Sequence, residues 1–291
     1  PILDAAALQE RLKTHNISLA IEIPPGFGKE SERGTPTEIS AWIDGTHPMR
    51  GETIGGYVQG VHGTYMQERA RQQSGHPAGL RVRIEPRFRY NPTFESIYAM
   101  VPAVPAILLI LIPAILMAVS VVREKELGSI TNFYVTPSKR LEFILGKQAP
   151  YVAIGMLNFF LLTAVAVLVF QVPLKGSALT LTFAALLYVT ATTGIGFLIS
   201  TFTSSQMAAV FGTAIFTMMP TIQFSGMLQP VSTLEGGARI MGSLWPTTYY
   251  MRISVGAFTK ALQARDLLGD LVALALFIPV LTLLSALFLR K

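Results

Sequence analysis

The chain has 291 residues, of which 51% are hydrophobic and 14% charged, and its mean hydropathy is +0.48. This composition excludes a single soluble globular domain, because the chain carries more apolar surface than one core can hide. The net charge of +6 comes from dispersed basic residues that form no basic stripe, which argues against direct binding of nucleic acid, and the absence of cysteine excludes disulfides and thiol chemistry.

Residues 1–97 are predicted to form a small α/β domain. Helices are expected over 4–13 and 52–73, and strands over 17–23, 38–44 and 81–90. The first two strands show alternation, with Leu19, Ile21 and Ile23, and then Ile39, Ala41 and Ile43, on one face. The second helix places apolar residues at helical spacing, at Ile54, Tyr57, Val58, Val61, Tyr65 and Met66. The order helix, strand, strand, helix, strand fits helices packed on one sheet.

All four histidines lie in this domain. A metal site formed by His47, His62 and Asp44 is one interpretation, but the spacing of these residues matches no compact metal-binding motif. A surface or turn role for the histidines is favoured, and we predict no bound metal.

Five stretches are long and apolar enough to cross a bilayer as helices. They are 98–122, 148–170, 178–202, 207–229 and 267–289; the first four carry no charged residue and the last is uncharged from Leu271. Such spans offer no proton relay, ion site or metal site inside the bilayer, which excludes intramembrane catalysis. A channel or sensor is less expected, because no polar stripe lines any span. Small residues predict close helix contacts, at Gly155, Gly194, Gly196, Ala208 and Gly212.

The distribution of Lys and Arg predicts the orientation of the spans. The connection 123–147 holds five basic residues and the C-terminus ends in two more, whereas the loop 171–177 has only Lys175. The positive-inside rule therefore places 123–147 in the cytoplasm and residues 1–97 outside it. A domain exported at the N-terminus needs a preceding span, so we expect the chain to be a fragment that lacks its first span.

A first motif follows the first span directly. Charges of both signs alternate and a glycine then breaks the helix, at Arg123, Glu124, Lys125, Glu126, Leu127, Gly128 and Ser129. A membrane loop needs only a few basic anchors, so these mixed charges exceed what anchoring requires. Considered alone, the segment is best interpreted as a solvated loop between spans.

A second motif follows the fourth span. Gly226 and Pro230 come first, and two short amphipathic helices are then expected within 231–266, broken at Pro246 and flanked there by Trp245, Tyr249 and Tyr250. One face would hold Leu234, Ala238, Met241 and Leu244, and the other Tyr250, Ile253, Ala257, Phe258, Ala261 and Leu262. Such a segment suits a re-entrant position in the outer membrane interface, with an ordinary interfacial loop as the alternative.

Over its whole length the chain resembles the membrane subunit of type-2 ABC exporters, the ABC-2 permeases. The matching words are Ala-Ile-Glu-Ile-Pro-Pro-Gly-Phe at 20–27, Arg-Glu-Lys-Glu-Leu-Gly-Ser at 123–129, Thr136-Pro137, Gly146-Lys147, Gly194-Ile195-Gly196, Ser225-Gly226, Pro230 and Pro246-Thr247-Thr248-Tyr249-Tyr250. More narrowly, the chain is similar to the C-terminal membrane region of the bacterial ribosome-associated ATPase, in which ATP-binding cassettes and such a permease are fused. The family has six spans, and this chain has five.

The resemblance implies the permease of an ATP-driven exporter in the bacterial inner membrane. It implies that 124–130 is the coupling helix, that 231–266 holds re-entrant helices, and that the permease works as a homodimer or heterodimer among membrane lipids. ATP and Mg²⁺ would bind a partner nucleotide-binding domain, because no phosphate-binding loop is present: the tempting Gly26-Phe27-Gly28-Lys29 has Ile23 at the first glycine position and Glu30 at the Ser/Thr position. The partner ATPase would also mediate any contact with the ribosome. The alternative function is a membrane anchor of a ribosome-associated ATPase that transports nothing.

Overall fold

A computed structural model describes residues 5–14, 17–32, 37–45, 48–72, 82–89, 96–129, 140–227, 231 and 234–289. The chain divides into two compact units, Pro1–Ser96 and Ile97–Lys291. The boundary expected from the sequence lies one residue later, between 97 and 98.

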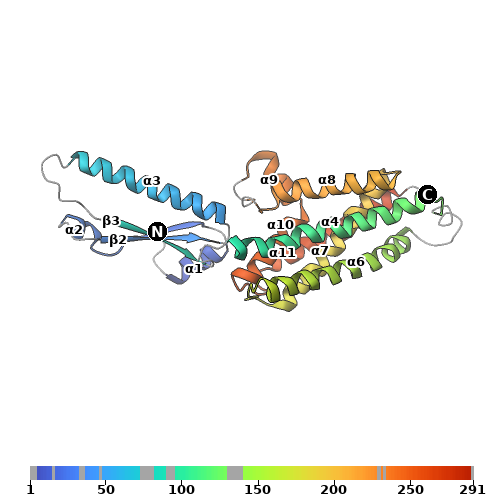
Figure 1. Cartoon of the computed structure of the whole chain (residues 1–291), viewed down its shortest axis with the longest axis horizontal. Helices are drawn as coiled ribbons and strands as arrows, with labels where there is room; N and C mark the ends of the chain where they lie inside the picture. The colour runs from blue at the N-terminus through green and yellow to red at the C-terminus, as the bar shows by residue number, and fades with distance from the viewer. Residues whose placement is uncertain are drawn as a thin grey trace. The chain divides into compact units, whose positions relative to one another are not determined.

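The first unit is built on a three-stranded sheet, which agrees with the predicted α/β class. Strand β2 (Thr37–Asp44) lies between β1 (Leu19–Glu22), which is antiparallel to it, and β3 (Val82–Arg89), which is parallel to it. Parallel neighbours need a crossover connection, and the 25-residue helix α3 (Pro48–Gln72) supplies it (Figure 1). The helix α1 (Ala5–Lys13) was predicted, whereas the short helix α2 (Phe27–Glu32) was not.

The apolar faces predicted in this unit are only partly correct. Ala41 and Ile43 of β2 are fully buried, and Val58 of α3 is also buried. In contrast, Ile21 is 56% exposed, because β1 is a short edge strand. The predicted face of α3 is also too wide, since its remaining described aromatic and aliphatic residues are exposed, at Tyr57, Val61 and Tyr65, with Ile54 half-buried. The side chain of Met66 lies outside the described part of the structure.

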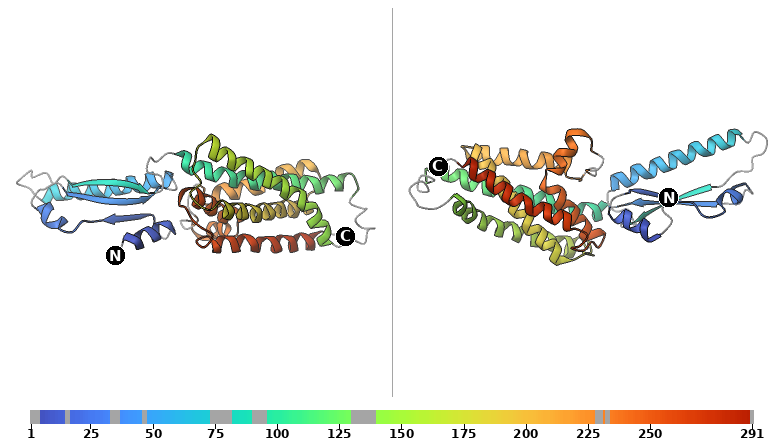
Figure 2. Two further views of the ribbon diagram at one scale, coloured as in Figure 1. Left: turned by 90° about the horizontal axis from the view of Figure 1, so that it is seen from below. Right: turned by 180° about the vertical axis from the view of Figure 1, so that it is seen from behind.

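The second unit is a bundle of five long helices, which confirms a polytopic helical membrane protein. Figures 1 and 2 show these helices running side by side, with two short helices beside and among them. The long helices are α4 (Ser96–Glu126), α6 (Arg140–Ala164, continued by the π-helical turn η1 over Val165–Val169), α7 (Ala178–Phe202), α8 (Gln206–Phe224) and α11 (Leu268–Phe288). The short ones are α9 (Gly236–Ser243) and α10 (Pro246–Thr259).

The ends of three helices differ from the predicted spans by four or more residues. Helix α4 continues through the mixed-charge motif to Glu126, and α6 begins at Arg140, eight residues before the predicted start at 148. Helix α8 ends at Phe224 rather than 229, and Gly226 then adopts a left-handed φ of 93°, which favours glycine after a helix. The serines at 177 and 205 cap α7 and α8 by accepting hydrogen bonds from Thr180 N and Ala208 N.

Helix α7 is the most buried of the five spans and packs against α6, α8, α10 and α11. Small residues permit this, as predicted, at three of the five positions. A side chain at Gly196 would strike the backbone of Ala114 in α4, one at Gly155 would strike Val189 in α7, and Gly194 faces Leu281 in α11. The prediction is wrong for Ala208, which is exposed, and for Gly212, where an added Cβ would meet no atom within 4 Å.

Candidate functional site

One end of the bundle gathers the charged residues of the first motif. Consecutive long helices run in opposite directions, so the C-termini of α4, α7 and α11 and the N-termini of α6 and α8 lie at the same end. We call this the charged end. The hydrogen bonds and ion pairs described next show that the motif is part of the bundle and not a detached loop.

Lys125 caps the C-terminus of α7. Its Nζ donates hydrogen bonds to the carbonyl oxygens of Ser200, Thr201 (3.4 Å) and Thr203 (3.3 Å). The last carbonyls of a helix have no partner within the helix, and the helix dipole makes that end negative, so an ammonium group suits it in both respects.

Glu126 caps the N-terminus of α8. Its carboxylate accepts hydrogen bonds from the backbone N–H (2.8 Å) and from the side-chain amide of Gln206, the first residue of that helix. An anion is favoured there because the first N–H groups are unpaired and the dipole is positive. Two neighbouring residues of α4 therefore bind the two sides of the α7–α8 turn. The positive Lys125 binds the negative end of α7, and the negative Glu126 binds the positive end of α8.

Two further contacts extend the charged end to the other helices. Glu124 forms an ion pair with Lys147 of α6, and both side chains are about three-quarters buried. Arg140, at the start of α6, donates a hydrogen bond of 2.9 Å to the carbonyl oxygen of Ala286 near the end of α11. Charged side chains thus connect all five long helices at this end.

The remaining residues of the first motif face outward. Arg123 and Ser129 are exposed, and Leu127 is 70% exposed. Gly128 ends the helix with a left-handed φ of 70°. The predicted continuation through 130 lies outside the described residues. The motif therefore has residues that bond to the other helices, of which Glu124 and Lys125 are half-buried and Glu126 is exposed, and residues whose side chains point into solvent.

The second motif forms a helix break inside the bundle. Trp245 caps α10 in an extended conformation, and Pro246 occupies its first turn, where a missing N–H costs nothing. The prediction of two amphipathic interfacial helices is wrong for α10, because its residues are buried on nearly all sides and Arg252 is its exposed residue. The prediction agrees better with α9, because the apolar side chains of Met241 and of the following Leu244 are exposed. Pro230 lies outside the described part of the chain.

A directed chain of hydrogen bonds passes through this break; we call it the polar chain. The indole N–H of Trp245 donates to Thr221 Oγ1 (2.9 Å). The hydroxyls of Thr221 and Thr247 form a hydrogen bond of 3.3 Å, and those of Thr247 and Tyr188 form one of 2.8 Å. The Tyr188 hydroxyl donates to the carbonyl oxygen of Ala106 (2.7 Å). Each hydroxyl has one hydrogen, so the direction that satisfies every member runs from Trp245 to Ala106. The polar chain joins α8, α10, α7 and α4.

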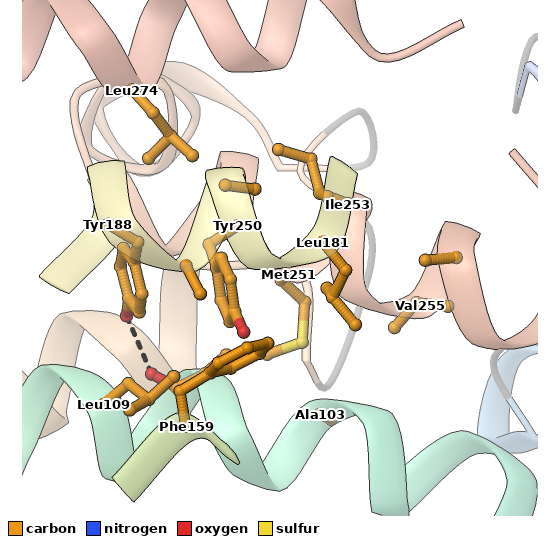
Figure 3. Packing of buried hydrophobic residues seen from close by; sticks show 14 of the residues in the cluster. Ala103, Leu109, Phe159, Leu181, Tyr188, Tyr250, Met251, Ile253, Val255 and Leu274 are labelled. Carbon is orange, nitrogen blue, oxygen red and sulfur yellow. Dashed lines mark hydrogen bonds between the residues drawn. The ribbon is translucent and has the colours of Figure 1, made fainter. Parts of the chain in front are cut away.

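The ring of Tyr188 also stacks on that of Tyr250, with centroids 4.4 Å apart and an angle of 4° between the planes. Figure 3 shows the two rings side by side and the hydrogen bond that leaves Tyr188. Further along α10, Ser254 donates to the carbonyl oxygen of Pro102 in α4 (2.6 Å), and Arg252 forms an ion pair of 3.2 Å with Asp270 in α11. Helix α10 is therefore bonded to α4, the first long helix of the bundle in chain order, and to α11, the fifth.

Several residues of these sites were not singled out from the sequence. Tyr188 and Thr221 belong to the polar chain, and Gln148 of α6, which is 4% exposed, donates to Thr190 O (2.6 Å) and Thr193 Oγ1 (2.8 Å) of α7. The amide at 148 was visible as the polar first residue of a span without charged residues. Thr221 gave no such signal, because hydroxyls in membrane helices usually bond to their own backbone, and Thr247 was quoted only as part of a matching word.

Among the residues that the structure describes, no three metal-ligating side chains come together. Of the three residues in the alternative metal site, Asp44 is buried at the end of β2 and His62 is half-buried in α3, while His47 lies outside the described residues.

Comparisons with known proteins point to one class. A family model described as "ABC-2 family transporter protein" matches residues 1–287. The chain is 29% identical over 296 residues to the "Probable multidrug ABC transporter permease YbhS" of Escherichia coli (strain K12), covering 99% of this chain and 74% of the relative. It is 24% identical to "Probable multidrug ABC transporter permease YbhR" (91% and 70% covered) and 23% identical to "Inner membrane transport permease YhhJ" (87% and 67% covered), both of the same organism. No solved structure matches the chain.

Proposed function

The chain belongs to the ABC-2 family of transporter proteins and is a permease component of an inner-membrane ABC transporter. We propose that its partner ATPase contacts the charged end and that conformational changes driven by ATP hydrolysis are transmitted to the permease there. Membership of this family implies an ABC ATPase as partner. We place ATP and Mg²⁺ on that ATPase. The alternative of a non-transporting anchor is not favoured, because the relatives are named as transport permeases.

One observation carries the coupling proposal. Glu124, Lys125 and Glu126 bind α6, α7 and α8, while Arg123 and Leu127 on the same helix end are exposed. A partner that pushes on the exposed side would move three helices together, because the inner side holds them through charge-assisted bonds. A solvated loop would not need this division between inner and outer faces.

We further propose that the transported compounds are amphipathic or lipid-like. The five spans are strongly apolar, and relatives named as multidrug permeases share nearly the whole length of the chain. Such a permease would work with a second permease domain, either identical or a sister chain. Contact with the ribosome would belong to an ATPase fused or bound to this chain. In this arrangement residues 1–97 lie outside the cytoplasm.

Truncating Leu127 to Ala tests the coupling proposal. In vesicles containing the permease and its ATPase, we expect the amount of a lipophilic fluorescent dye moved per ATP hydrolysed to fall about fivefold or more, since truncating an interface anchor costs about 1 kcal/mol or more. The measurement pairs dye movement with phosphate release in the same vesicles.

Leu157→Ala is the matched control, because Leu157 on α6 is 69% exposed and Leu127 is 70% exposed. The control should keep the dye moved per ATP of the unmodified protein. An unchanged ratio in Leu127→Ala, with both variants inserted normally, would remove the coupling assignment. Glu126 is less suitable for this test, because its replacement would also uncap α8.

A further inference from the structure

A cavity of about 380 Å³ lies among the membrane helices, beside the break between α9 and α10. Its walls come from α7, α8, α11 and the turn at Trp245, with Ile199, Phe216 and Leu281 among the lining residues. This volume falls in the range of cavities that hold small ligands. Gly212 leaves one wall open, because a Cβ there would meet no atom within 4 Å.

Among the residues that the structure describes, the walls of this cavity offer no unengaged polar side chain to a ligand. Two lining residues carry polar side-chain atoms, and both are already engaged. The indole N–H of Trp245 donates to Thr221 (2.9 Å), and the hydroxyl of Thr203 donates to the carbonyl oxygen of Ile199 (3.2 Å). A water molecule needs at least two polar partners to stay in a cavity, so water is disfavoured here. An occupant has to be a hydrocarbon.

The cavity opens on the side of the bundle. Three residues of its lining are more than half exposed: Phe202 (68%), Phe216 (53%) and Leu244 (63%). These residues belong to helices long and apolar enough to span a membrane or to the helix break, so the opening lies on the side of the membrane unit. An empty space open to the bilayer forfeits dispersion contacts on its walls, and lipid chains are the hydrocarbon that surrounds it.

We propose that this cavity binds an acyl chain of a membrane phospholipid, in contact with Trp245. The site goes beyond the transport function, because it requires only that the helices span a bilayer. The chain enters between α7 and α8 and lies against the indole ring, which the hydrogen bond to Thr221 and the edge contact with Phe216 (5.7 Å between centroids) hold in place.

Tryptophan fluorescence tests the site directly, because Trp42 and Trp245 are the two tryptophans of the chain. The full chain carrying Trp42→Phe is reconstituted in phosphatidylcholine vesicles whose acyl chains are brominated, since bromine quenches indole fluorescence on close contact. We expect strong quenching of Trp245 although only 7% of this residue is exposed. Gly212→Phe, which fills the cavity from α8, should lower the quenching several-fold. Gly212→Leu provides a second filling variant if the first does not insert.

Gly146→Phe is the matched control, because Gly146 on α6 is also exposed and a side chain there would meet no atom within 4 Å. It adds the same ring outside the cavity and should leave the quenching unchanged. Absence of quenching in the Trp42→Phe chain would show that something other than lipid, such as a second copy, covers the cavity. Equal quenching in the Gly212 and Gly146 variants would show that lipid reaches Trp245 by another route. Either result overturns the proposal.

Discussion

Tyr188 and Tyr250 are stacked, fully buried and chemically identical, but their hydroxyl groups have different surroundings. That of Tyr188 donates to Ala106 O and accepts from Thr247, whereas that of Tyr250 has no hydrogen-bond partner among the residues that the structure describes. A buried polar group lowers stability when unpaired and contributes when paired. The two residues therefore allow the polar chain to be tested by removing one oxygen atom at a time.

We expect Tyr188→Phe to destabilise the membrane unit by about 1–2 kcal/mol, because two hydrogen bonds are lost in an apolar interior. Tyr250→Phe should change the free energy of unfolding by less than about 0.5 kcal/mol or raise it, because it removes an unpaired oxygen and keeps the stacked ring. Unfolding by sodium dodecyl sulfate in mixed micelles measures both. Equal losses in the two variants would mean that the polar chain contributes nothing beyond packing.

The sequence pointed to several of these residues but not to their partners. Trp245, Pro246 and Tyr250 were identified from an aromatic cluster at a proline, which is a local signal. Tyr188 and Thr221 were missed, and Thr247 was given no role, since their hydrogen bonds run to other helices and leave no trace in the spacing of residues. Gln148 was missed as a contact for the same reason.

At the scale of the helices, the contacts of α4 with the α7–α8 turn depend on the order of two charged residues, Lys125 and Glu126. Lys125 meets the negative end of one helix and Glu126 the positive end of the next. We expect the exchange Lys125→Glu with Glu126→Lys to lower the melting temperature of the protein in detergent. Each new charge would then have the same sign as the helix end that it faces. The net charge does not change.

A second exchange serves as the control for this prediction. Glu124→Lys with Lys147→Glu reverses an ion pair between two side chains and keeps its attraction. It should leave the melting temperature close to that of the unmodified protein. Equal effects of the two exchanges on the melting temperature would contradict the claim that Lys125 and Glu126 stabilise the ends of α7 and α8 through their charges.

Two glycines in the spans make opposite predictions at the same scale. Gly196→Ala should destabilise the bundle by about 1–3 kcal/mol, because its Cβ would strike the backbone of Ala114, which cannot move aside as a side chain can. Gly212→Ala should be neutral or stabilising by about 0.5–1 kcal/mol, since open space surrounds it and alanine favours the helix. The same detergent titration measures both, and a loss at Gly212 would contradict the open cavity wall.

The number and order of the long helices were predictable, while their ends were not. Apolar runs determine which residues lie in the bilayer, and all five were identified from them. Helices α4 and α6 extend past those runs because Glu124, Lys125 and Lys147 find partners in the bundle, which only the folded structure shows. The burial of α10 was not predicted for a similar reason: its apolar face fitted an interfacial helix, and the hydrogen bonds of Thr247 to α7 and of Ser254 to α4 are visible only in the folded structure.

At the scale of the whole protein, the orientation of the chain is the prediction that decides whether the charged end can meet a cytoplasmic ATPase. The chain has no cysteine, so single cysteines can be introduced without further changes. Ser129 at the charged end and Gln59 on α3 are both exposed. We expect a membrane-impermeant maleimide to label Gln59→Cys from outside the inner membrane, and Ser129→Cys only after the membrane is permeabilised. Labelling of Ser129→Cys from the outside would reverse the orientation and exclude the proposed coupling.

The position of α10 also has a consequence for how the protein is made. This short helix bonds to α4, α7 and α8, which are synthesised before it, and through Arg252 to Asp270 in α11, which is synthesised after it. A nascent chain that has not yet inserted α11 therefore leaves one side of α10 without its neighbour. The enclosure of α10 is therefore completed only when α11, which follows it in the chain, has entered the membrane.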